Sequence, residues 1–196
     1  MILIDSPVAN TANIARALRA AGATIELSRD PDVVARAGKL VLPGVGSFAA
    51  ARAWLAQSGI DSAITTAVER NAFLLGICVG HQLLFDVSYE HGETRGLGLI
   101  RGSIRRIDGP LPVPQIGWNR VRGKEAILFD GIADGTSFYF VNSYAARDAD
   151  NEIAAAEYNG RFTAAVQRER VFGVQFHPEK SSAAGLRVLR NFVQCN

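Results

Sequence analysis

Residues 73–85, FLLGICVGHQLLF, decide the fold, because an apolar run ends there in a cysteine between two glycines. The run predicts a buried strand over residues 72–78 that turns sharply into a helix over residues 79–89. Gly76 and Gly80 let the backbones of such a turn approach closely. The turn carries Cys78 to the carboxyl end of the strand, where open parallel sheets bind their ligands.

Strands and helices alternate up to about residue 90. Asn10, Ser47 and Asp61 are expected N-caps. We expect strands at 1–4, 23–28, 39–44 and 72–78, and helices at 10–22, 47–59, 60–71 and 79–89. This alternation predicts an α/β fold, with an open, mostly parallel sheet and helices on both faces.

Short strands separated by Gly, Asp and Asn dominate the second half of the chain. We expect them at 96–108, 114–123, 137–146, 152–160 and 162–177. A last helix is expected at 181–194. These strands are expected to add antiparallel or mixed pairing to the same sheet or beside it.

The composition is that of an ordinary soluble globular protein, and a chain of 196 residues predicts a single domain, 1–196. The net charge of +2 is too small to indicate a nucleic-acid partner. Two widely separated cysteines favour a reducing compartment, and no signal peptide is expected, because MILIDSP is not followed by a long apolar region. No apolar run approaches the roughly 18 residues of a membrane span. We therefore expect a cytoplasmic protein. Metal-ligand spacing and a dinucleotide fingerprint are both absent, so no cofactor is expected.

Cys78 at the helix N-terminus is a candidate nucleophile, because that position favours the thiolate. The N–H of Val79 would face an oxyanion beside the sulfur. His177 ends the apolar stretch GVQFH, and Glu179 follows two residues later. A thiol nucleophile needs a base, and the base needs a partner that fixes its tautomer. The alternatives are a buried structural cysteine and a capped polar histidine.

The stretch LPGVGSF, residues 42–48, is a second glycine loop at a strand end. Its backbone N–H groups, at Val45 and Gly46, are candidates to complete an oxyanion hole. The alternative is a generic turn between a strand and a helix. The loop lacks the lysine of a phosphate-binding loop.

Together these three stretches resemble the class I glutamine amidotransferases over nearly the whole chain. The resemblance implies hydrolysis of L-glutamine to glutamate and ammonia. Cys78 would attack the side-chain amide and form a γ-glutamyl thioester, with His177 as general acid and base and Glu179 as its orienting partner. Gln82 would help to hold the substrate, together with main chain near Tyr139, Asn142 and Ser143.

Within that class the chain is most similar to the glutaminase subunits of imidazole glycerol phosphate synthases. The similarity rests on PGVGSF at 43–48, GLGLI at 96–100, PQIGWN at 114–119, YFVNSY at 139–144 and QFHPEKS at 175–181. It implies a heterodimer with a (β/α)8 cyclase subunit, which receives ammonia through a channel. The pair would convert PRFAR into imidazole glycerol phosphate and AICAR in histidine biosynthesis. Trp118 would then line the interface near the ammonia exit.

The sequence departs from that family at three places. The glycine-rich opening DYGxGN, which faces the partner in the family, is DSPVAN at residues 5–10, although Asn10 and Asn13 persist. Asn142 replaces the usual histidine, and His81 replaces a common methionine. Three alternatives follow: a glutaminase serving another synthase, such as an amidino-sugar enzyme; a non-catalytic regulatory subunit; and a cysteine hydrolase acting on another amide.

Overall fold

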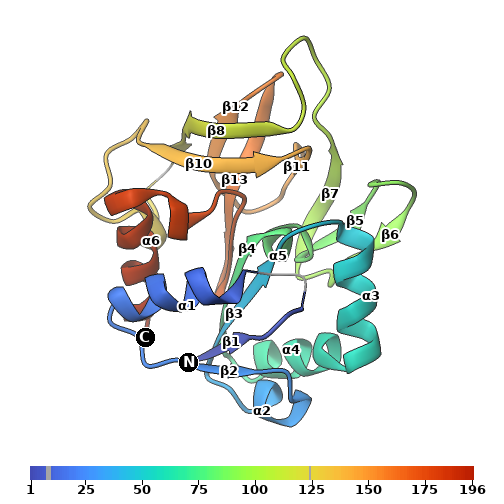
Figure 1. The fold of residues 1–196 in the computed structure, drawn as a ribbon, viewed down its shortest axis with the longest axis vertical. Coiled ribbons are helices and arrows are strands. Elements are labelled where there is room, and N and C mark those ends of the chain that lie inside the picture. The colour runs from blue at the N-terminus through green and yellow to red at the C-terminus, as the bar shows by residue number, and fades with distance from the viewer. Residues whose placement is uncertain (8–9, 124) are drawn as a thin grey trace.

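The computed structural model describes residues 1–7, 10–123 and 125–196 (Figure 1). The first half contains β1 Ile2–Ile4, α1 Thr11–Ala20, β2 Glu26–Ser28, α2 Pro31–Ala35, β3 Lys39–Gly44, α3 Phe48–Ser58, α4 Ile60–Glu69, β4 Phe73–Cys78, α5 Val79–Gln82, β5 Phe85–Ser88 and β6 Thr94–Arg95. The second half contains β7 Ile100–Arg106, β8 Gln115–Arg120, β9 Arg122–Gly123, η1 Ile127–Phe129, β10 Ser137–Asn142, β11 Tyr144–Ala146, β12 Glu152–Glu157, β13 Arg161–Arg168, β14 Val171–Val174, η2 Pro178–Lys180 and α6 Ser182–Gln194.

An eight-stranded sheet forms the centre of the molecule, in the order β2-β1-β3-β4-β14-β13-β12-β9. The strands from β2 to β14 are parallel, and β13, β12 and β9 continue the sheet in antiparallel pairing. The predicted α/β fold with an open, mostly parallel sheet and added antiparallel strands is therefore confirmed. Because β3, β4 and β14 are parallel neighbours, their carboxyl ends meet at one edge of the sheet.

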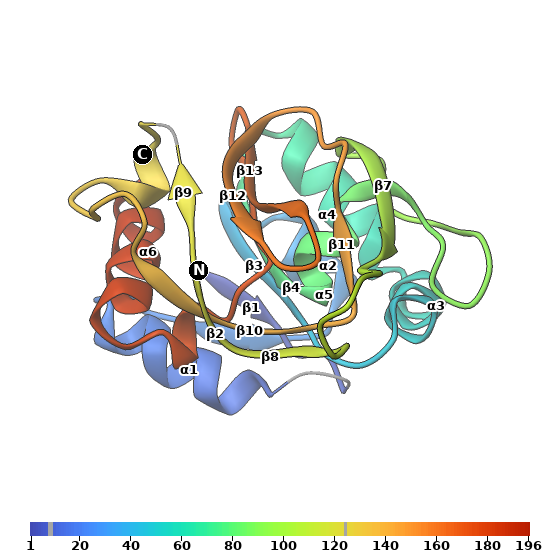
Figure 2. The ribbon, with the colours of Figure 1, turned by 90° about the horizontal axis from the view of Figure 1, so that it is seen from above.

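Helices cover both faces of this sheet, as Figure 2 shows from above. α1 packs with α6 on one face, and α4 packs with α2 and α3 on the other. The strands between them are almost wholly apolar, as expected of parallel strands covered on both faces. In β3 and β4 the residues Leu40, Val41, Leu74 and Leu75 are fully buried.

The second half adds strands both to the central sheet and beside it, as expected. β8 and β10 form a separate antiparallel pair that lies across the upper end of the molecule in Figure 1. A four-stranded sheet in the order β11-β7-β5-β6 lies beside it. Within the described ranges, no helix has the length and apolar character needed to cross a membrane.

The expected helix over residues 79–89 is wrong, because α5 ends at Gln82 and residues 85–88 form strand β5. The carbonyl of Leu83 accepts the N–H of Leu97, and the carbonyl of Leu84 accepts those of Leu99 and Ile100. These carbonyls are therefore unavailable to a continuing helix. Pairing of β5 with β7, between segments distant in sequence, outcompetes the local helical pattern.

Two of the three expected caps are confirmed. The side chains of Asn10 and Ser47 accept the N–H groups of Asn13 and Ala50. Asp61 is not a cap, because Gly59 in the left-handed conformation already begins α4. The Asp61 carboxylate instead pairs with Arg52 at 2.9 Å. Helix α2 was not expected, although Asp30 caps it and Pro31 occupies its first turn.

Candidate active site

Cys78 stands on a strained turn between β4 and α5. Its φ of 55° and ψ of −111° lie in a region that residues other than glycine rarely adopt. A Cβ added at Gly76 would lie 2.6 Å from the carbonyl oxygen of Gly80, and one added at Gly80 would lie 1.9 Å from that of Leu42. Only glycines therefore allow this turn, as the sequence predicts. The turn leaves the Cys78 side chain just 4% exposed.

His177 reaches the same edge of the sheet from β14, since Val174 pairs with Ile77 of β4. Its Nδ1 lies 2.8 Å from Oε1 of Glu179, and both side chains are buried. Pro178 ends the extended segment and begins the single turn η2, which brings Glu179 back beneath the imidazole. The backbone N–H of His177 donates to the carbonyl of Tyr139, which fixes the position of His177 relative to β10.

The imidazole of His177 sits between a sulfur and a carboxylate. Burial lowers the pKa of His177, but hydrogen bonds with Cys78 and Glu179 and the charges of these two groups outweigh it and raise the pKa to about 10. His177 is therefore protonated at neutral pH. Its positive charge thus lies beside the sulfur of Cys78.

The second glycine loop lies next to the turn that carries Cys78. Gly44 at the end of β3 pairs in register with Cys78, and a Cβ at Gly44 would lie 2.7 Å from the backbone nitrogen of Gly80. Beyond it, Val45 is 38% exposed and Gly46 has a φ of +84° with open space around its Cα. The N–H groups of Val45 and Gly46 have no hydrogen-bond partner among the described residues.

A cavity of about 260 Å³ opens beside Cys78. Its wall includes Gly46, Val79, Gln82, Glu90, Asn142 and Ser143. The structure thus brings most of the predicted site residues together. The described lining of the cavity does not include Val45, Tyr139, His177 or Glu179. His177 contacts the sulfur of Cys78, and the carbonyl of Tyr139 accepts the N–H of His177.

The amide of Gln82 is already engaged by the protein. Its Nε2 donates to the carbonyl of Tyr144 at 2.9 Å and to Oε1 of Gln175 at 3.0 Å. Both amide hydrogens are therefore used, and the side-chain oxygen remains for a ligand. Asn142 donates its Nδ2 to the same carbonyl of Tyr144, and its buried Oδ1 has no partner in the described part of the chain.

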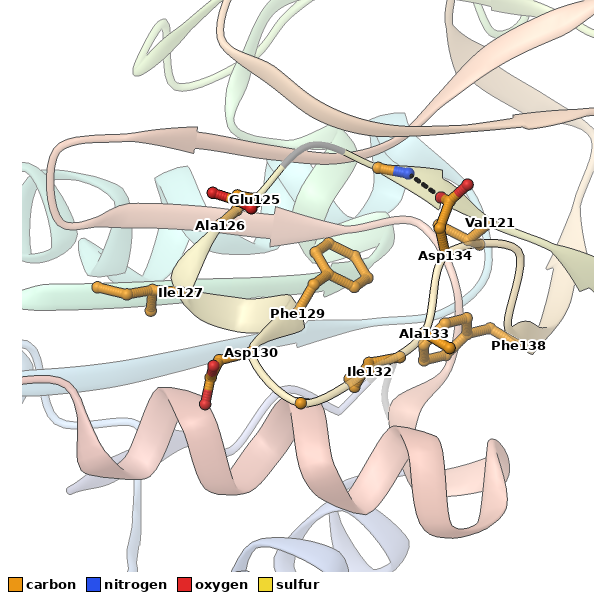
Figure 3. A pocket seen from close by; sticks show the side chains of 12 residues that line it. Val121, Glu125, Ala126, Ile127, Phe129, Asp130, Ile132, Ala133, Asp134 and Phe138 are labelled. Carbon is orange, nitrogen blue, oxygen red and sulfur yellow. Dashed lines mark hydrogen bonds between the residues drawn. The ribbon is translucent and has the colours of Figure 1, made fainter.

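A larger cavity, of about 660 Å³, lies between β10 and the segment around η1 (Figure 3). Phe129 and Phe138 contribute apolar surface, and Asp134 accepts the N–H of Gly123. Its described lining contains neither cysteine nor histidine, so the smaller cavity at Cys78 is the candidate active site.

The sequence model of the family described as glutamine amidotransferase class-I matches residues 2–195. This chain belongs to the class I glutamine amidotransferases. Curated relatives named imidazole glycerol phosphate synthase subunit HisH are similar to this amidotransferase over nearly its whole length. The protein of Moorella thermoacetica is 45% identical over 193 residues, covering 97% of this chain and 92% of its own. The protein of Herpetosiphon aurantiacus is 45% identical over 194 residues, covering 98% and 92%.

Solved structures show the same fold at much lower sequence identity. A crystal structure of a glutamine amidotransferase has a TM-score of 0.78 at 18% identity and covers 98% of this amidotransferase and 97% of its own chain. PurLQS from Thermotoga maritima has a TM-score of 0.76 at 18% identity, covering 97% and 95%. Such similarity extends to the arrangement of the sheet and its helices.

Three residues of this amidotransferase site had no role in the sequence analysis. Gln175 places its Nε2 3.9 Å from the sulfur of Cys78. Ser181 donates its hydroxyl to the carbonyl of His177 and accepts the N–H of Tyr139. Glu90 lines the cavity. Alternation along the strand indicates Gln175, two residues before His177. Glu90 carried no such signal, because its approach to Cys78 depends on β5, which was expected to be helix.

The predicted interface residues of the amidotransferase lie outside this cavity. Asn10 caps α1, and Asn13 accepts a hydrogen bond from Arg16 at 3.0 Å. Trp118 is 54% exposed on β8, with its ring edge-on to that of Tyr139. Val8 and Ala9, in the altered opening segment, fall outside the described residues, as does Lys124.

His81 is the one histidine of this amidotransferase that is wholly buried. It follows Cys78 by three residues, and neither ring nitrogen has a hydrogen-bond partner within the described ranges. Burial lowers its pKa to about 3, so the ring is neutral at physiological pH. The ring packs edge-on against that of Phe85.

Proposed function

We propose that this chain is the glutaminase subunit of an imidazole glycerol phosphate synthase in histidine biosynthesis. It hydrolyses L-glutamine and passes ammonia to a (β/α)8 cyclase subunit, which converts PRFAR into imidazole glycerol phosphate and AICAR. The observation that carries the proposal is that Cys78 lines a cavity and contacts His177, whose Nδ1 lies 2.8 Å from Oε1 of Glu179. The HisH relatives support the choice of synthase.

The chemistry begins when the Cys78 thiolate attacks the side-chain amide carbon of glutamine. Negative charge develops on the amide oxygen, where the N–H groups of Val79 and of Val45 or Gly46 stabilise it. The protonated His177 gives its proton to the amide nitrogen, so that the C–N bond breaks and ammonia leaves a γ-glutamyl thioester. His177 then takes a proton from water, which attacks the thioester and releases glutamate and the thiolate. Glu179 orients the imidazole throughout.

The cavity matches the ends of a glutamine molecule. Glu90 is the charged side chain in its described lining, and its carboxylate suits the α-ammonium group. Gln82, Asn142 and Ser143 supply neutral polar groups around the rest of the substrate. No step of this reaction requires a metal or cofactor to balance.

A cyclase subunit would cover the face that carries Trp118, with Asn10 and Asn13 at its edge. The exposed apolar side chains of this face, Ile116 and Trp118, are 64% and 54% exposed. Burial of such side chains is typical of the centre of a protein–protein interface. A single domain over residues 1–196 and a cytoplasmic location remain part of the proposal.

The decisive experiment measures glutamine hydrolysis by the purified chain, alone and with the host's cyclase subunit plus PRFAR. We expect slow hydrolysis by the free chain and strong stimulation in the complex. The second glycine loop, called the oxyanion loop from here on, would present the N–H of Val45 or Gly46 to the oxyanion only after the cyclase subunit docks. Cys78→Ala should abolish hydrolysis and leave the thermal unfolding cooperative. Full activity of Cys78→Ala would exclude catalysis by Cys78, His177 and Glu179. Full activity without a partner would exclude control of the oxyanion loop by docking.

A different ammonia acceptor is the second candidate, and the sequence of the opening segment and Asn142 favours it. Labelling with a glutamine-mimicking electrophile separates the two. Modification of Cys78 that excess glutamine prevents, without stimulation by the cyclase, would retain the glutaminase and assign it to another synthase. An unlabelled Cys78 would favour a non-catalytic subunit.

A further inference from the structure

Glu90 makes a contact that substrate binding does not require. Its Oε2 accepts the backbone N–H of Phe48 at 2.6 Å. Phe48 is the first residue of α3 and directly follows the loop Val45–Gly46–Ser47. The same carboxylate also lines the cavity at Cys78. One side chain therefore touches both the substrate cavity and the end of the second glycine loop.

The beginning of α3 depends on this contact. The first N–H groups of a helix have no partner within the helix. Ser47 accepts the N–H of Ala50 at 3.3 Å, and Glu90 accepts that of Phe48. A carboxylate near a helix N-terminus is stabilised by the partial positive charge there. The position of Ser47, and of the loop before it, is thus tied to Glu90.

The loop has few other restraints. Gly44 is held in the sheet by its pairing with Cys78, but the N–H groups of Val45 and Gly46 have no partner in the described part of the chain. Glu90 itself is well anchored. Its own N–H donates to the hydroxyl of Ser88, which is fully buried in β5. The fixed ends of the loop are therefore Gly44 on one side and the Glu90–Phe48 contact on the other.

We propose that Glu90 is a positioning residue that sets the place of the oxyanion loop relative to the bound substrate. Resting on the proposed function, the inference gives its two oxygens separate tasks. Oε2 holds the N–H of Phe48, and Oε1, without a hydrogen bond to any described residue, receives the substrate's α-ammonium group. The substrate and the N–H groups that stabilise its oxyanion are then held to the same carboxylate.

Two variants separate these tasks. Glu90→Gln keeps an oxygen that accepts the N–H of Phe48 but removes the charge. Glu90→Ala removes both. In the complex with the cyclase subunit, we expect both variants to raise the KM for glutamine about tenfold or more, and we expect the kcat of Glu90→Ala to be about tenfold lower than that of Glu90→Gln. Equal kcat values for the two variants would overturn the positioning role.

A substrate without the α-ammonium group, 4-carbamoylbutanoate, provides the matched control. With it, the KM of Glu90→Gln should rise much less than it does with glutamine, and the kcat of Glu90→Ala should still fall well below that of Glu90→Gln. If Glu90→Ala does not fold, Glu90→Asp replaces it. Its shorter side chain retains the charge but cannot reach both partners, so its kcat should also fall. An unchanged kcat in Glu90→Asp would contradict the inference.

Backbone hydrogen exchange tests the loop without relying on glutamine as substrate. We expect exchange at residues 45–48 to accelerate about tenfold in Glu90→Ala and to remain unchanged in Glu90→Gln. Equal protection in both variants would overturn the positioning role even if the protein is a glutaminase. Accelerated exchange together with no glutamine hydrolysis by the unaltered complex would keep the loop contact and reject the proposed function.

Discussion

Two glycine loops lie side by side at the carboxyl ends of β3 and β4, and they are built in opposite ways. Residues 76–80 are closed on every side, since a Cβ at Gly76 or Gly80 would collide with backbone, and Cys78 is buried. In residues 44–47, backbone packs closely only against Gly44. Gly46 has open space around it, and Val45 is exposed. Two segments that both begin and end in glycine, GICVG at 76–80 and GVG at 44–46, thus form a fixed turn in one case and an open loop in the other.

The difference follows from the tasks proposed for the loops. A nucleophile must keep a fixed position relative to its base, and rigid packing provides that. An oxyanion donor has to be in place only during the reaction, so its loop is free to respond to substrate and partner. Rigid packing at Cys78 and open space at Gly46 are what that division of tasks requires.

The largest expected effect comes from adding a side chain to the tightly packed turn at residues 76–80. Gly80→Ala places a Cβ 1.9 Å from the carbonyl oxygen of Leu42, so the turn or strand β3 must move. We expect a loss of about 3 kcal/mol or more in the free energy of unfolding. Urea denaturation followed by circular dichroism measures it.

Gly46→Ala is the matched control for this change. It meets no neighbouring atom, and its cost is the strain of a φ of +84°, about 1 kcal/mol. Its main effect should be on kcat, because the loop loses conformations. Equal destabilisation by the two alanines would refute the contrast between the loops.

A smaller effect is expected from changing Glu179, the partner of His177. Glu179→Gln removes a charge that raises the pKa of His177 from its ordinary value towards 10. In the proposed reaction the protonated imidazole gives its proton to the leaving amide nitrogen, so activity is lost as pH rises through the pKa of His177. The basic limb of kcat/KM should therefore move down by about 1–3 pH units in Glu179→Gln. Profiles from pH 6 to about 10.5 test this, and an unmoved basic limb would separate Glu179 from the ionisation of His177.

The smallest effect concerns the residue packed beneath the fixed loop. His81→Met replaces a buried imidazole with unpartnered nitrogens by an apolar side chain of similar size. We expect stabilisation of about 1 kcal/mol at neutral pH. Because burial lowers the pKa of His81 to about 3, the unfolded chain binds a proton first as pH falls below 6.5. The advantage of His81→Met should therefore grow between pH 6.5 and pH 3. Thermal unfolding across this range measures it, and a pH-independent difference would contradict the buried neutral state.

Features encoded locally were predictable from the sequence. The apolar runs of β3 and β4, and the caps Asn10 and Ser47, depend on neighbouring residues and were found. The approach of Cys78 and His177 was predictable because both follow buried strands that end at one sheet edge. β5 was not, because its strand form depends on pairing with β7. Glu90 was missed for the same reason, since that pairing brings it to the cavity.

The register between β3 and β4 sets a limit on how this chain can change in length. The strands pair without a shift from Lys39 and Phe73 to Gly44 and Cys78. One residue added to or removed from either strand would displace its end by about 3.3 Å and turn the following side chains to the opposite face. The distance between the oxyanion loop and the sulfur of Cys78 is thus set by the number of residues in β3 and β4 and not by their side chains. We therefore expect insertions and deletions to be excluded from residues 39–44 and 73–78, while substitutions of similar volume are tolerated at the buried apolar positions such as Leu40, Val41, Leu74 and Leu75.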